Sequence, residues 1–124
     1  MVAARGPALV VAYIEVAPNE FPAKQYLDQL RAERGDAYHA AVLHLFKWIA
    51  DHGRIQNIEK FRQLDDGIVE FKHHQARVLG FFEPGGFLML THGFTKQQAK
   101  TPPTEIARAK RIRDEYRSKK PPRT

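Results

Sequence analysis

The segment from residue 68 to residue 94 restricts the fold most strongly, because its apolar residues recur with a period of two and its links are short. Three runs, residues 68–72, 76–82 and 87–94, are rich in β-branched and aromatic residues. They are joined by "HHQ" and by "EPGG", where proline presets φ and glycine supplies a positive φ. Links of this length connect antiparallel neighbours. The segment therefore predicts a three-stranded antiparallel meander.

The residues before this meander predict one strand and two helices. Residues 7–18 are β-branched and aromatic and lie between two prolines, which is typical of a strand. Pro22 suits a first helical turn and Gly35 a helix end, so a helix is predicted over residues 22–34. A second helix is predicted from Asp36, as N-cap, to Gly53. Its apolar residues at helical spacing are Tyr38, Val42, Leu45, Trp48 and Ile49.

Two further segments complete the expected order. The connector after Gly53 is predicted to hold a helical turn over residues 59–64. Pro102 and Pro103 open a last helix, with Glu105 in its first turn. The order of strand, two helices, three strands and helix predicts a single α+β domain over residues 1–124, with helices packed on one face of an antiparallel sheet. Residues 118–124 are predicted to form a disordered tail.

The positive charge is concentrated at the C-terminal end of the chain. The net charge is +6, and residues 95–124 hold ten Lys and Arg against three Asp and Glu. A lopsided basic segment is typical of proteins that bind a polyanion or an acidic protein. A solvated helix face is the alternative explanation, and the charge does not decide between them.

Several classes of protein do not fit the sequence. The chain has no cysteine, which excludes disulfides, iron–sulfur clusters and thiol catalysis. No secretory leader and no apolar stretch of membrane-spanning length is found, so a cytoplasmic protein without a membrane partner is expected. His73 and His74 lack further ligands at metal-site spacing, and no phosphate loop or dinucleotide motif occurs. We therefore expect neither a metal nor a cofactor.

Hairpin geometry predicts that three cationic or titratable side chains form a row across the meander. If "EPGG" closes the second hairpin with Phe82 opposite Phe87, Arg77 lies opposite His92. If "HHQA" closes the first hairpin, Lys72 lies opposite Arg77. Like charges directly opposite each other are unfavourable, so such a row indicates a site for an anion such as a phosphodiester. A bulge would move one member, and Glu70 offers an ordinary ion pair to Arg77 instead.

The C-terminal 40% or so of the chain resembles the HigB-like branch of the RelE/ParE toxin superfamily. That branch reads Glu-Leu-Arg, then Arg-Val-Leu-Tyr-Phe, a glycine turn, His-Gly-Phe, a lysine-rich link, Lys-Thr-Pro and a helix beginning Glu-Ile. The corresponding strings here are "EFK", "ARVLGFF", "HGF", "TKQQAKTPP" and "EIARA", in the same order and spacing. The resemblance implies a curved antiparallel sheet, built from the meander and an N-terminal strand, with two helices on one face and a C-terminal basic helix.

The resemblance also implies a function and a set of site residues. It implies the toxin of a type II toxin–antitoxin pair that cleaves messenger RNA in the ribosomal A site, without a metal and through the 2′-OH. Arg77 corresponds to the family's central-strand arginine, and Lys72 to the arginine of its Glu-Leu-Arg motif. Lys96 corresponds to the first lysine of the link, and His92 to the histidine before Gly-Phe. Further RNA contacts are expected from four residues of the link and the last helix: Lys100, Arg108, Lys110 and Arg111.

These residues suggest a mechanism and a set of partners. His92 would act as general base or acid, Arg77 would stabilise the charge on the phosphorane, and Lys72 and Lys96 would position the phosphate or neutralise the leaving oxygen. The ribosome, messenger RNA and an antitoxin of the helix-turn-helix DNA-binding type are the implied partners. Two alternative functions stay open. The protein could poison a topoisomerase, as the ParE branch does, or it could bind RNA or an antitoxin without cutting.

Three positions depart from the family pattern. Lys72 replaces an arginine and loses its bidentate fork. Gln97 stands where a second lysine is usual. Gly80 stands where an aromatic residue is usual, and a residue on which a base could stack is therefore expected to be missing there.

Overall fold

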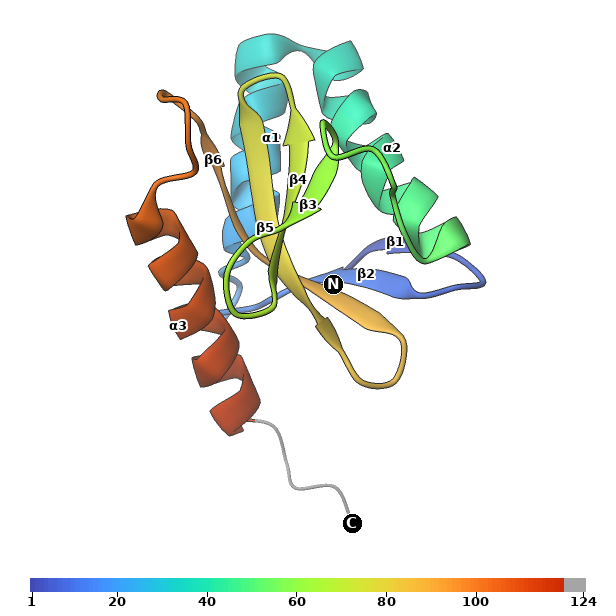
Figure 1. Cartoon of the computed structure of the whole chain (residues 1–124), viewed down its shortest axis with the longest axis vertical. Helices are drawn as coiled ribbons and strands as arrows, with labels where there is room; N and C mark the ends of the chain where they lie inside the picture. The colour runs from blue at the N-terminus through green and yellow to red at the C-terminus, as the bar shows by residue number, and fades with distance from the viewer. Residues whose placement is uncertain (120–124) are drawn as a thin grey trace.

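The computed structural model of the chain describes residues 1–119, which form six strands and three helices in an α+β arrangement (Figure 1). In chain order these are β1 (Val2–Arg5), β2 (Val10–Tyr13), α1 (Pro22–Arg34), α2 (Asp36–His52), β3 (Phe61–Gln63), β4 (Ile68–His73), β5 (Ala76–Glu83), β6 (Phe87–Thr95) and α3 (Pro103–Lys119). The predicted α+β class is confirmed. Of the predicted tail, residues 118 and 119 belong to α3, and residues 120–124 lie outside the described part.

The six strands form one twisted sheet in the order β1-β2-β6-β5-β4-β3. The meander of β4, β5 and β6 is antiparallel, as predicted. The sheet as a whole is mixed rather than antiparallel, because β2 runs parallel to β6. This direction follows from the two helices between β2 and the meander, which return the chain to the same end of the sheet.

Two local predictions were wrong. The single strand expected over residues 7–18 is reduced to β2, and a separate strand, β1, precedes it and pairs with it antiparallel. The N–H groups of Ala8 and Leu9 both donate to the carbonyl of Ala50, each at 3.0 Å, which fixes the turn between β1 and β2. The helical turn expected over residues 59–64 is instead β3, an edge strand that pairs with β4. Phe61 holds it there, with its ring 4.9 Å from that of Phe71.

The helices cover both faces of the sheet. Figure 1 shows α3 on one side, and α1 and α2 together on the other. The bounds of α1 and α2 agree with the prediction, and Gly53 ends α2 with φ 80°. Gly35 rather than Asp36 occupies the N-cap position, and Asp36 is the first helical residue.

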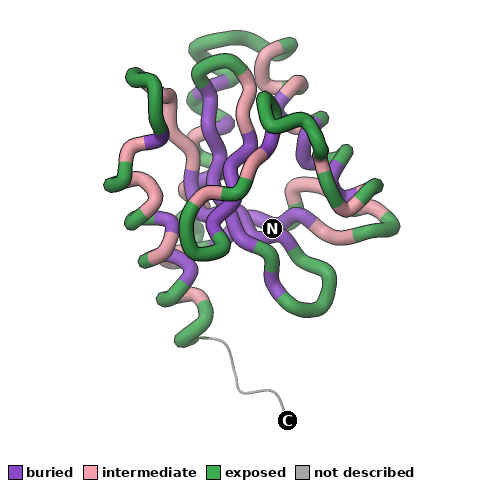
Figure 2. The backbone as a smooth tube through the Cα atoms, viewed as in Figure 1, coloured by how far each residue is buried: buried purple, intermediate pink, exposed green. Residues whose placement is uncertain are grey.

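The buried residues form two apolar clusters, one on each face of the sheet. Figure 2 shows the buried positions concentrated in the strands at the centre of the molecule. The larger lies beneath α1 and α2 and includes Leu27, Phe46 and Phe71. The smaller lies beneath α3 and includes Leu79 and Ile112. Trp48, predicted to belong to the apolar stripe of α2, is 46% exposed. Because the larger cluster supplies most of the core, the α3 face has room for polar groups.

The register of the second hairpin differs from the predicted one. Glu83, not Phe82, lies opposite Phe87, so the turn has three residues. A bulge then follows: Gly80 lies opposite Leu90 and Leu79 opposite His92, which leaves Thr91 as an extra residue in β6. The Thr91 hydroxyl donates to the carbonyl of Leu79 at 3.2 Å and so stabilises the bulge. A bulge shifts every pair beyond it, and Arg77 consequently lies opposite Phe94.

Gly80 does not mark a lost stacking residue on the α3 face. Its neighbours Leu79 and Phe81 face α3, so by strand alternation position 80 faces α1 and α2. A Cβ atom at Gly80 would lie 2.5 Å from the carbonyl oxygen of Met89, which requires the backbone to move. Glycine at this position is therefore explained by close packing of β5 against β6.

Candidate functional site

Four cationic side chains from different parts of the chain gather on the α3 face of the sheet. Arg62 lies on β3, Lys72 on β4, Arg77 on β5 and Lys96 directly after β6. We call these four residues the cationic cluster. One buried carboxylate, that of Glu70 on β4, lies among them.

The strand register explains why these residues share a face. Arg62 lies opposite Glu70, and Lys72 lies opposite Arg77, as predicted. Opposite residues in an antiparallel pair point to the same side of the sheet, and so do residues two apart on one strand. Glu70 also lies opposite Leu79, which packs beneath α3. The cluster therefore faces α3 and the link of residues 96–102 that leads to it.

Glu70 is the centre of the site and is fully buried. It accepts a hydrogen bond from Nε of Arg62 at 3.0 Å and another from the hydroxyl of Thr101 at 2.5 Å. Nε of Arg77 lies 3.9 Å from its second oxygen, close enough for attraction but too far for a hydrogen bond. The carboxylate thus joins β3, β4 and the link.

Arg77 is 5% exposed and is not fully satisfied. One of its terminal nitrogens donates to the carbonyl oxygens of His74 and Ala76, the latter at 2.9 Å. Its Nε is buried and has no hydrogen-bond partner among residues 1–119. A buried N–H group without an acceptor costs about 1–3 kcal/mol. An anion that enters the cluster would supply the missing acceptor.

Lys72 and Lys96 form the accessible edge of the cationic cluster, where both side chains are half-buried. The Nζ atom of Lys72 donates to the carbonyl of Ile58 at 3.3 Å. The pKa of Lys96 is lowered, first by desolvation and then by the positive charge of Arg77; Glu70 opposes this shift, and Lys72 and Arg62 add smaller contributions to it. A lower pKa makes the amine a weaker base but increases the fraction that is neutral and able to accept a proton.

His92 lies on the same face but not beside Arg77, so the predicted three-residue row is wrong in its third member. Its ring is buried beneath α3, with Nε2 3.0 Å from Oε1 of Glu105 and Nδ1 3.2 Å from the hydroxyl of Thr91. Burial, followed by the charge of Arg108, lowers its pKa to about 4. The ring is therefore neutral at pH 7. Because a carboxylate only accepts, Nε2 carries the proton and donates to Glu105.

The basic residues of the link and of α3 fall into two groups. Three bind carboxylates of the sheet and its loops, and so hold α3 in place: Lys110 with Asp65, Arg113 with Asp66, and Arg117 with Glu83. The other expected RNA contacts, Lys100, Arg108 and Arg111, are exposed. Within the part of the chain that the structure describes, these three make no ion pair. Part of the C-terminal charge is therefore structural.

Sequence reasoning missed Arg62 and Thr101. Arg62 fell in a segment predicted to be a helical turn, and only the pairing of β3 with β4 brings it to Glu70. Thr101 belongs to the Lys-Thr-Pro match, but no role was predicted for its side chain. Its Oγ1 receives a hydrogen bond from Arg62 at 3.3 Å and donates to Glu70. For Arg62, the only usable sequence signal was the near alternation of charged residues along the strands, namely Arg62, Glu70, Lys72 and Arg77.

Residues 1–119 lack two further features. They contain no group of three or more His, Cys, Asp or Glu residues placed to hold a metal ion. None of the helices in that range combines the length and the apolar character that crossing a membrane requires.

The chain belongs to the family described as Phage derived protein Gp49-like (DUF891), whose model matches residues 25–114. This family belongs to the RelE/ParE toxin superfamily and is a toxin-like family of toxin–antitoxin systems. No curated protein matches the chain. The matched residues include all of the cationic cluster, Glu70 and most of α3, and the resemblance to the superfamily is confirmed.

Proposed function

We propose that the protein is the toxin of a type II toxin–antitoxin pair, of the HigB-like kind, and that it cleaves messenger RNA on the ribosome. The observation that carries this proposal is the cationic cluster, in which four positive side chains surround one buried carboxylate. Stability alone does not explain such an excess of charge, because like charges on neighbouring strands repel. The family is associated with toxin endoribonuclease activity in general, which supports the proposal.

The cluster can hold a phosphate of the RNA backbone at its accessible edge. Lys72, Lys96 and the partly exposed Arg62 would contact the non-bridging oxygens, and Arg77 would add its charge from beneath. Direct contact with the buried Nε of Arg77 requires residues 96–102 to move, and residues 97–100 of this link are exposed. Donors placed in this way stabilise the charge that develops on a phosphorane, and each is worth about 3–4 kcal/mol.

Lys96, rather than His92, is the better candidate for the general base. His92 is buried, bonded to Glu105 and separated from Arg77 by the bulge. Lys96 reaches the accessible edge, and its pKa is lowered by desolvation and by neighbouring cations. His92 would then be a positioning residue that holds α3 against the sheet. Cutting without a strong base suits an enzyme whose substrate is already aligned by the ribosome.

The proposed reaction is an internal transfer of the phosphodiester. The neutral amine of Lys96 takes the proton of the 2′-OH, and the 2′-oxygen bonds to phosphorus. The bond from phosphorus to the 5′-oxygen breaks, and the ammonium group of Lys72 gives this oxygen a proton. The products are a 2′,3′-cyclic phosphate end and a 5′-hydroxyl end. No metal takes part.

An antitoxin is the second proposed partner, and the family supports this. An antitoxin of the helix-turn-helix DNA-binding kind would present acidic side chains to the exposed cations Lys100, Arg108 and Arg111. Complementary charge increases the rate of such an association and fixes its orientation. A small DNA-binding protein encoded next to this chain would agree with the proposal.

One observation favours a second candidate function, a module that binds RNA or antitoxin without cutting. His92 is closed off by α3, and Arg77 is 5% exposed, so the described conformation exposes two lysines and Arg62 but not the imidazole of His92. Such a protein would bind RNA through the cluster and leave it intact.

Mapping of RNA ends in cells that express the chain separates these functions. The endoribonuclease predicts new 2′,3′-cyclic phosphate ends within translated transcripts, and none in RNA that is not translated. Intact transcripts with normal growth would favour the binding module. Intact transcripts with an induced DNA-damage response would instead indicate a poison of topoisomerase, as in the ParE branch.

A further inference from the structure

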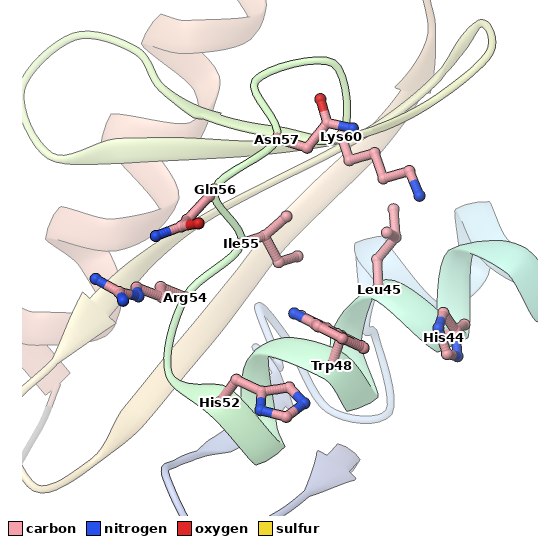
Figure 3. A pocket seen from close by; sticks show the side chains of 9 residues that line it. All are labelled: His44, Leu45, Trp48, His52, Arg54, Ile55, Gln56, Asn57 and Lys60. Carbon is pink, nitrogen blue, oxygen red and sulfur yellow. The ribbon is translucent and has the colours of Figure 1, made fainter.

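A groove of about 550 Å³ lies between α2 and the connector of residues 54–60, away from α3 (Figure 3). Leu45 and Trp48 line it from α2, and Ile55 faces them from the connector. Trp48 is 46% exposed, although it lies in a helix that otherwise turns its large apolar residues to the core. An exposed tryptophan in a hollow is a platform on which a planar group can stack.

The surroundings of Trp48 favour a planar partner. The imidazole of His52 lies 4.2 Å from the indole and that of His44 6.3 Å, one turn to either side on α2. These rings fix the orientation of the indole and leave part of it open to solvent. Base–aromatic stacking tolerates every base, because each has a π-face.

The charges around the groove favour an anionic ligand over a basic peptide. No Asp or Glu lines the groove, and Arg54 and Lys60 stand near its two ends. In Figure 3, Lys60 extends over the side of Leu45, and Arg54 projects from the connector on the opposite side. Neither cation makes an ion pair with any residue between 1 and 119. Two cations without ion pairs, one near each end of a groove that holds an aromatic ring, suit the phosphates that flank a nucleobase.

Two hydrogen bonds join the connector that lines the groove to Lys72 of the cationic cluster, beside the edge strand β3. The carbonyl of Lys60 accepts a hydrogen bond from the backbone N–H of Lys72 at 2.8 Å. The Nζ atom of Lys72 in turn binds the carbonyl of Ile58, within the same connector. An RNA chain that leaves the cationic cluster at Lys72 would therefore pass Lys60 and then reach the groove.

We propose that this groove binds an unpaired nucleobase of single-stranded RNA, which stacks on Trp48 while Lys60 and Arg54 bind the neighbouring phosphates. The proposal rests on the proposed function, because it extends the path of the RNA beyond the cleaved phosphate. It assigns the groove to RNA rather than to an apolar side chain of an antitoxin. The RNA would cross the edge of the sheet from the α3 face to the α2 face.

Trp48 is the only tryptophan in the chain, and its fluorescence reports the groove directly. The probe is a single-stranded oligoadenylate RNA, titrated into the full chain. We expect saturable quenching of the Trp48 emission, with a midpoint that matches the affinity measured from the anisotropy of the labelled RNA. Binding that leaves the emission unchanged would overturn the proposal.

Variants at the groove give a second test by anisotropy. Trp48→Ala should weaken RNA binding roughly 5- to 100-fold, the range of one lost stacking contact, while Trp48→Phe should keep most of the affinity. Lys60→Ala should lower the slope of log affinity against log salt by about 0.7, the value for one phosphate of a single strand. Phe87→Ala, an equally exposed aromatic on the β5–β6 hairpin, and Lys24→Ala on α1 are matched controls and should change neither quantity.

The outcomes separate this proposal from the proposed function. Suppose that RNA still quenches Trp48 in a Lys72→Ala, Lys96→Ala double variant, and that the parent protein does not cut RNA. The nuclease proposal is then refuted, and the groove proposal stands. If the parent cuts RNA, but Trp48→Ala binds and cuts as the parent does, the groove proposal fails and the nuclease stands. Unchanged RNA affinity of Trp48→Ala together with lost binding of the purified antitoxin would assign the groove to the antitoxin and overturn the proposal.

Discussion

The two faces of the sheet are built on different principles. The face beneath α1 and α2 is closed by a continuous apolar cluster that includes Phe46, Phe71 and Leu27. The face beneath α3 is apolar only in part, and the rest holds charged or titratable side chains, among them Glu70 and Arg77. A domain of this size gains most of its stability from apolar burial, so the first face supplies stability and leaves the second free for charge.

The way in which the helices are attached differs accordingly. Phe46 of α2 inserts into the core, with its ring 4.9 Å from that of Phe71. α3 buries Ala109 and Ile112, and its further contacts include the hydrogen bond between Glu105 and His92 and ion pairs such as that between Arg113 and Asp66. A helix held in part by ion pairs at its edge can leave the sheet at a smaller cost than one held by aromatic packing. We therefore expect the α3 face to open more readily than the face beneath α1 and α2.

The largest effect is expected on the apolar face. Phe46→Ala removes a fully buried ring and should lower the free energy of unfolding by about 3–5 kcal/mol. Chemical denaturation measures it. Trp48→Ala, two residues further on the same helix but half exposed, should cost clearly less. Equal losses for the two variants would show that the apolar cluster does not have the described packing.

On the polar face, the largest effect is expected on activity. Arg77→Ala should lower the rate of RNA cleavage by about 10²–10³-fold, because it removes the charge beneath the phosphate. Growth inhibition should be lost with it, while circular dichroism shows a folded protein. Arg77→Lys should retain part of the activity. If Arg77→Ala is as toxic as the parent, the cluster is not the site.

The buried imidazole of His92 should make the free energy of unfolding depend on pH. The pKa of His92 is about 4 when folded, against 6.5 for an ordinary histidine, since burial disfavours the charged ring. The unfolded chain then binds the proton more readily, so His92 should reduce the free energy of unfolding as pH falls from about 6.5 to 4. The loss is on the order of 3 kcal/mol and should be absent above pH 6.5. His92→Gln should flatten the profile; the same slope in this variant would refute the assignment.

Replacing Glu70 should have opposite effects on the stability of the protein and on its affinity for RNA. Glu70→Gln should lower the free energy of unfolding by about 1–3 kcal/mol, because Arg62 and Thr101 lose a charged acceptor. It also removes the only negative charge inside the cluster, so the affinity for RNA should increase. Glu20→Gln, at an exposed position, should change neither property. A loss of RNA affinity in Glu70→Gln would argue against phosphate binding at this face.

Strong local patterns made most of the fold predictable. The alternation in β4, β5 and β6 and the proline and glycine signals at α1 and α2 gave bounds within a residue or two of those observed. The short strand β3 has three residues, too few to show a period, and its existence depends on β4. β1 and β2 were merged for a similar reason, since only the turn between them separates two short runs.

The site was less predictable because its geometry depends on register and on a helix far along the chain. The pair Lys72–Arg77 followed from the short first turn. The position of His92 did not follow, because neither the three-residue turn at Pro84 nor the bulge at Thr91 has a strong sequence signal. That α3 covers His92 through Glu105 is a tertiary contact that no local pattern shows.

Chemical protection of lysines by bound RNA tests the central claim most directly. The ε-amines of Lys72 and Lys96 are modified with and without saturating single-stranded RNA, and the modified sites are read by mass spectrometry. The account predicts that RNA protects both amines and leaves Lys24 on α1 as reactive as before. Unchanged reactivity of Lys72 and Lys96 while RNA is bound would show that nucleic acid does not lie on this face.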